Sequence, residues 1–63
     1  MTYTTLFKCS GIKAVEMVSN EACYSVRVIE DRDGAWYPIA ESRPYTDRKK
    51  AEASFKGYVR RYL

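Results

Sequence analysis

Basic side chains gather near the carboxyl end of this 63-residue chain. Residues 43–63 carry seven Lys or Arg and two Asp or Glu, whereas residues 1–42 carry four and six. Lysine and arginine bind phosphate oxygens, and a stripe of them gives an affinity that falls steeply as salt rises. The local net charge of +5, against −2 for the rest, predicts a contact with nucleic acid, although an ordinary solvated helix has a similar composition.

These basic residues are spaced for one helix over residues 46–62. At about 100° per residue, Lys49, Lys56 and Arg60 fall on one side, flanked by Lys50 and Arg61. The apolar residues gather on the opposite side: Ala51, Phe55, Tyr58, Val59 and Tyr62. We therefore expect an amphipathic helix whose apolar side packs on a sheet and whose basic stripe faces solvent.

The chain around this segment contains signals for where the helix begins and ends. Pro44 disfavours helix before it, and Thr46 is expected to be the N-cap, with Asp47 next to the positive helix end. Arg60 and Arg61 lie in the last turn, where cations are favoured.

The preceding residues supply the sheet. Residues 22–30 alternate apolar and polar side chains and predict a strand, residues 36–41 predict its partner, and residues 12–18 favour a third strand over a short helix capped by Ser10. Residues 1–11 fit an edge strand, a bulged start of the next strand or a loose arm. The expected fold is α+β: a single domain with a three-stranded antiparallel sheet packed against one carboxy-terminal helix.

The hairpin joining 22–30 to 36–41 allows a prediction of register. With residues 31–34 as the loop, Val28 pairs with Tyr37 and Val26 with Ile39, which puts all of them on the helix side. Pro38 cannot donate to the ladder, so its strand is expected to be an edge strand or to be bulged.

No residues are spaced for catalysis. The chain has no histidine, no phosphate-binding glycine loop, and cysteines only at Cys9 and Cys23, so we expect no enzyme, cofactor, metal site or small-molecule substrate. The acidic residues Glu30, Asp31 and Asp33 suit a turn better than a cation site. Without a signal peptide or a membrane-length apolar run, we expect a cytoplasmic protein that does not contact membranes and keeps reduced, buried or half-buried cysteines.

A second candidate surface is the sheet face away from the helix. Ile29, Trp36 and Arg27 are predicted to lie there, where an exposed tryptophan indicates a contact site unless the amino-terminal arm covers it, which we favour. Arg27 and Arg43 could reach base edges if the sheet entered a major groove.

The outer side of the helix also carries small residues. Ala53 and Gly57 lie four residues apart, and glycine inside a helix costs about 1 kcal/mol relative to alanine. A close-packed partner would explain them, and so would tolerance of a weak helix former.

Residues 23–60 resemble a known family. Gly34 in the hairpin, Trp36-Tyr37 after it and the helix start from Thr46 to Ala51 are similar to the AP2-like amino-terminal domains of phage and mobile-element integrases. The resemblance implies three strands packed on one helix and a DNA-related role in a free-standing accessory protein. The glycine-aromatic pair that precedes the helix in that family is missing, and these strands are less basic than its DNA-facing strands.

Two functions follow as hypotheses. The first is a non-enzymatic nucleic-acid-binding accessory or regulatory protein that uses the helix stripe. The alternative is a protein-interaction module, either a homodimer or an inhibitor of a host protein, that uses Trp36 and Ile29 or Ala53 and Gly57.

Overall fold

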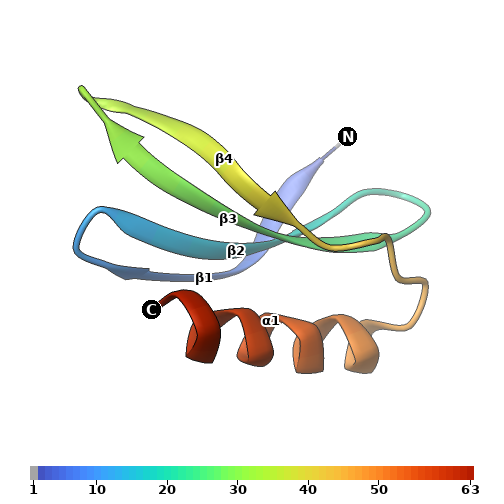
Figure 1. The fold of residues 1–63 in the computed structure, drawn as a ribbon. Helices are drawn as coiled ribbons and strands as arrows, with labels where there is room; N and C mark the ends of the chain where they lie inside the picture. Colours follow the sequence, from blue (N-terminus) through green and yellow to red (C-terminus); the bar gives the residue numbers. More distant parts are fainter. Residues whose placement is uncertain (1) are drawn as a thin grey trace.

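A helix lies across one face of an antiparallel meander (Figure 1). The computed structural model describes residues 2–63, which form a four-stranded sheet in the order β1-β2-β3-β4 and one carboxy-terminal helix. The elements are β1 (Tyr3–Ser10), β2 (Lys13–Ser19), β3 (Tyr24–Arg32), β4 (Ala35–Glu41) and α1 (Arg48–Tyr62). The α+β class and the packed helix are confirmed. The prediction of three strands is wrong, because the amino-terminal segment adds a fourth.

Strand β1 is an edge strand, which was one of the three alternatives for residues 1–11. It pairs antiparallel with β2 from Tyr3 opposite Ser19 to Ser10 opposite Lys13, with an irregularity between Thr4 and Leu6. Gly11 takes a φ of 62° in the turn into β2, a conformation that glycine adopts without steric cost. Leu6 packs against the core, so the segment is held by burial as well as by its backbone hydrogen bonds.

The core lies between α1 and the two central strands. Val15 and Met17 of β2 pair with Val28 and Val26 of β3, and all four are fully buried together with Ala51 of α1. Full burial of one such valine or methionine contributes about 1.5–3 kcal/mol. The helix packs against this cluster through Phe55, Tyr58, Val59 and Tyr62.

The β3–β4 hairpin has a tighter turn than expected. Strand β3 continues to Arg32, opposite Ala35, and the turn consists of Asp33 and Gly34, both with positive φ. Tyr37 therefore pairs with Glu30, and the predicted Val28–Tyr37 and Val26–Ile39 pairs are wrong. The pairing register is shifted by two residues from the predicted one, so Tyr37 still lies on the predicted side of the sheet. It lies nearer the hairpin tip, however, and the tip rises away from α1 (Figure 1).

An irregularity in the pairing of β4 places Ala40 opposite Val28. Ile29 pairs with Pro38, so Ile39 is the extra residue. Strand β4 is the other edge of the sheet, and the prediction for the Pro38 strand is confirmed. Ala40 packs against the core, whereas Ile39 remains exposed.

The N-cap of helix α1 lies one residue later than predicted. Asp47, and not Thr46, is the N-cap: its Oδ1 accepts a hydrogen bond from the Lys49 amide at 2.9 Å. Tyr45 explains the delay, because its backbone exchanges two 2.7 Å hydrogen bonds with Tyr24 and extends the pairing of β3 past Glu41. The chain can turn into the helix only after that bridge.

The cysteines are free, and their predicted burial is wrong for one of them. Cys23 is half-buried in the loop before β3, but Cys9 is exposed on β1. Cys9 pairs with Ala14 and so lies on the sheet face that α1 does not cover.

Candidate binding surfaces

The outer side of α1 carries the predicted basic stripe. Lys49, Lys56 and Arg60 are all exposed, while Phe55 and Val59 are half-buried against the core. This confirms the predicted orientation of the helix. Their spacing places the Cβ atoms of the three cations on one side of the helix.

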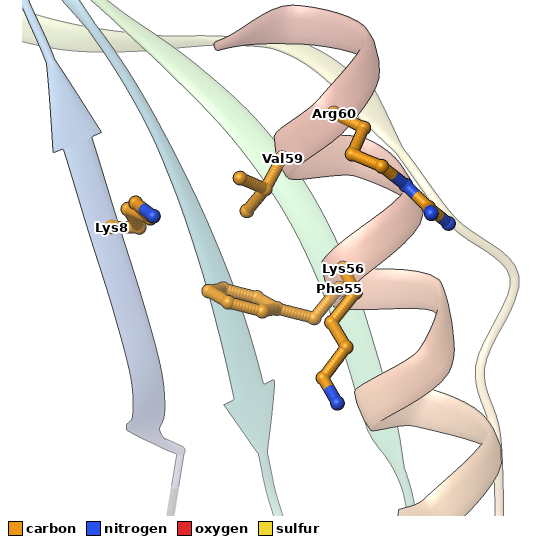
Figure 2. A pocket seen from close by; sticks show the side chains of 5 residues that line it. All are labelled: Lys8, Phe55, Lys56, Val59 and Arg60. Atoms are coloured by element: carbon orange, nitrogen blue, oxygen red, sulfur yellow. The ribbon is translucent and has the colours of Figure 1, made fainter.

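A fourth cation reaches the same surface from the sheet. Lys8 of β1 lines a groove together with Phe55, Lys56, Val59 and Arg60 of α1 (Figure 2). Figure 2 shows Phe55 and Val59 extending from the helix toward the sheet, whereas Lys56 runs along the helix and the guanidinium of Arg60 extends to the side of the helix away from Lys8. The result is an apolar floor with Lys8 on one side and two helix cations on the other. We call this the β1–α1 groove.

The β1–α1 groove carries positive charge without compensation. None of its described lining residues is acidic. The acidic residue one turn before Lys56 is Glu52, whose carboxylate binds Arg48 at 3.0 Å. Glu16 pairs with Phe7, the residue before Lys8 on β1, so it lies on the sheet face opposite to that of Lys8. An anionic ligand would therefore meet three cations and no carboxylate in this groove.

Other predicted basic residues lie on the other flank of α1. Arg61 lines a separate hollow with Ser54, Gly57 and Tyr58, and Lys50 precedes Ser54 by one helical turn. Arg43 lies over the Tyr45 ring, 5.4 Å from its centroid. The structure thus places the predicted basic residues of α1 on two flanks of the helix, whereas Arg27 lies on the sheet face away from α1.

Tyr45 has a perturbed hydroxyl on this second flank. Hydrogen bonds from Ser54 and then Arg43 lower the pKa of the Tyr45 hydroxyl, and the charge of Arg43 acts in the same direction. The tyrosine therefore links the segment between β4 and α1 to the helix through its hydroxyl and to β3 through its backbone bridge.

The sheet face away from α1 contains Arg27, Ile29 and Trp36, as predicted, but Ile29 is buried on it, at 8% exposure, and is not available as a contact residue. Trp36 is 47% exposed, and Phe7, which pairs with Glu16 on the same face, is 54% exposed. The predicted arm does not cover this face, because residues 3–10 form β1 at the edge of the sheet. Arg27 is held by Glu16, with its guanidinium 2.9 Å from the carboxylate, and so is not a free cation.

The two small residues of α1 have different surroundings. Ala53 is exposed and Gly57 is half-buried, and a Cβ built on Gly57 meets nothing within 4 Å. The fold itself therefore does not require glycine at position 57.

The acidic residues at the β3–β4 turn act locally. Asp31 Oδ1 accepts a hydrogen bond from the Gly34 amide at 3.2 Å, and Glu30 binds Arg32 at 2.9 Å. Across residues 2–63 no cluster of Cys, Asp or Glu is placed to hold a metal ion. The α1 helix is too short and too polar to cross a lipid bilayer.

Lys8 is the residue that sequence reasoning missed. The sequence feature that indicates Lys8 is its position two residues after Leu6, because residues two apart on a strand lie on the same face of the sheet, here the face that α1 covers. That signal has meaning only once residues 3–10 are recognised as a strand.

Comparison with protein-family models, with curated proteins and with solved structures finds no match.

Proposed function

We propose that this chain is a non-enzymatic nucleic-acid-binding protein that contacts phosphates through Lys8, Lys49, Lys56 and Arg60. The observation that carries the proposal is the meeting of β1 and α1 cations around a groove without a described carboxylate. Repeated cations on one face give sequence-independent affinity for a phosphate backbone.

The resemblance of residues 23–60 to integrase amino-terminal domains supports an accessory or regulatory role of phage or mobile-element type. The contact proposed here is on the helix side, because Arg27 on the open sheet face is paired with Glu16. We place the protein in the cytoplasm, where free cysteines such as Cys9 remain reduced.

A salt titration of DNA binding tests the proposal. With four phosphate contacts on duplex DNA, a plot of the logarithm of the binding constant against the logarithm of the salt concentration should have a slope of roughly −3 to −4. Replacing Lys56 and Arg60 together by Ala should weaken binding and reduce the slope by about 2.

The matched control is the double replacement of Lys50 and Arg61 by Ala. It removes the same charge from the same helix, but on the other flank. A small loss with this control and a large loss with Lys56 and Arg60 supports the proposed surface. Equal losses would mean that only total charge matters, and unchanged binding in both variants would reject the surface.

A second candidate function is a protein contact through the open sheet face. The observation that favours it is the exposure of Phe7 and Trp36 on the same face. Large aromatic residues are enriched among the side chains that dominate protein interfaces.

Sedimentation of the protein tests self-association, through either the open sheet face or the outer side of α1. Trp36→Ser should shift an open-face dimer toward monomer, whereas Gly57→Leu should do so if α1 forms the contact. A monomer with no change in either variant leaves the homodimer without support, and capture of a host protein that depends on Trp36 would indicate the inhibitor alternative.

A further inference from the structure

The floor of the β1–α1 groove is apolar, and a phosphate backbone alone does not explain that. Phe55 and Val59 form this floor and are half-buried, so part of their apolar surface remains open to a ligand. Binding gains free energy from this apolar surface when an apolar group of the ligand covers it and removes it from water. A ligand that matches the groove therefore has an apolar part between anionic parts.

The cations stand on both sides of this floor. Lys8 comes from β1, whereas Lys56 and Arg60 come from α1 (Figure 2). A single nucleic-acid strand has this arrangement, because each base is attached between two successive phosphates. In a duplex the bases are stacked and paired inside, and they reach such a floor only after unstacking.

We infer that the β1–α1 groove binds single-stranded nucleic acid, with a base against Phe55 and Val59 and its flanking phosphates on Lys8, Lys56 and Arg60. This inference rests on the proposed function and specifies its substrate class. Combined aromatic and cationic contacts are the usual means of binding single strands without sequence preference.

The length of the basic stripe favours nucleic acid over an acidic peptide. Lys49 and Arg60 are about 16 Å apart along the helix at 1.5 Å per residue, and Lys56 lies between them. A nucleic-acid strand supplies a phosphate at every nucleotide along such a line. An acidic peptide would need carboxylates at several specific positions and an apolar side chain at one more.

Varying the ligand tests the inference without changing the fold. The probes are an oligothymidylate of about a dozen nucleotides, within the range of known single-strand sites, and an abasic oligomer with the same number of phosphates. A base on the floor should make the oligothymidylate bind about tenfold more tightly, which corresponds to the usual contribution of one stacked base. A duplex with equal phosphate content should bind more weakly than the oligothymidylate.

A protein variant assigns the preference to the groove. Phe55→Leu keeps an apolar side chain but removes the ring, so it should reduce the preference for oligothymidylate over the abasic oligomer. Tyr58→Leu is the matched control, because Tyr58 lines the hollow on the other flank. Circular dichroism checks that both variants keep the fold.

The outcomes separate the two levels of the proposal. Equal, salt-dependent binding of oligothymidylate, abasic oligomer and duplex overturns the single-strand inference and leaves phosphate binding standing. Absence of binding to all three rejects both. Tighter binding of an acidic, leucine-containing peptide than of oligothymidylate overturns the inference in favour of a protein partner.

Discussion

The guanidinium of Arg27 lies 2.9 Å from the carboxylate of Glu16 on the sheet face that α1 leaves open. The two residues are directly opposite each other on β3 and β2. The Glu16 side chain is only 8% exposed, although no helix covers it. Its charge is therefore kept away from water by its neighbours on the sheet and depends on Arg27 for compensation.

Arg27→Ala is expected to lower the free energy of unfolding by about 2 kcal/mol, because it leaves a buried carboxylate without its cation. The 42% exposure of the Arg27 side chain keeps the effect below that of a fully buried pair. Urea denaturation measures the change. Adding Glu16→Gln should restore part of the loss, since a neutral amide is less costly to bury.

Arg32→Ala is the control for this prediction. Arg32 binds Glu30 near the hairpin tip and is 57% exposed, so its removal should cost less than about 1 kcal/mol. Equal losses for Arg27→Ala and Arg32→Ala would show that the Glu16–Arg27 pair has no special role.

The helix orientation could be predicted from sequence because the signal is local. Ala51, Phe55 and Val59 recur at helical spacing, and the stripe of Lys56 and Arg60 follows from the same period. Such a pattern is independent of what the rest of the chain does. The helix start was predicted one residue too early at the N-cap, because the Tyr24–Tyr45 bridge joins residues far apart in sequence.

The β1–α1 groove could not be predicted because it depends on long-range pairing. Lys8 meets Lys56 only after β1 has paired with β2 and α1 has crossed the sheet. The register error in the β3–β4 hairpin has a similar origin: Asp33 accepts a positive φ, so the turn needs two residues where four were expected. Local composition does not distinguish these two lengths.

Gly57→Ala is expected to raise the free energy of unfolding by about 1 kcal/mol, because alanine is the better helix former. Nothing lies within 4 Å of a Cβ at this position, so the added methyl group meets no obstacle. Thermal or urea unfolding measures the gain. Ala53→Gly should produce a loss of similar size, and a destabilised Gly57→Ala protein would point to a contact made by the glycine backbone.

Asp47→Ala is expected to cost about 1 kcal/mol, because the Lys49 amide loses the carboxylate that caps α1. Thr46→Ala should change stability by less than about 0.5 kcal/mol, since surface substitutions away from caps have small effects. The two variants are compared by urea denaturation. A larger loss at Thr46 than at Asp47 would return the N-cap to the position predicted from sequence.

The contribution of Tyr45 to the free energy of unfolding is expected to depend on pH. The hydrogen bond from Ser54 and the contacts with Arg43 lower the Tyr45 pKa in the folded state, so the folded protein loses this proton before the unfolded chain does. Stability from Tyr45 should therefore rise with pH between the lowered folded pKa and the unfolded value near 10. It should be complete above that value and disappear as pH falls through the folded pKa.

The difference in unfolding free energy between the wild type and Tyr45→Phe measures this contribution. The difference should increase with pH across that window, because phenylalanine has no proton to lose. Ser54→Ala removes the first cause of the shift and should flatten the increase. A difference that stays constant with pH would mean that the ionised hydroxyl gains nothing from Ser54 and Arg43, and that Tyr45 holds the segment between β4 and α1 only through its ring and its backbone bridge to Tyr24.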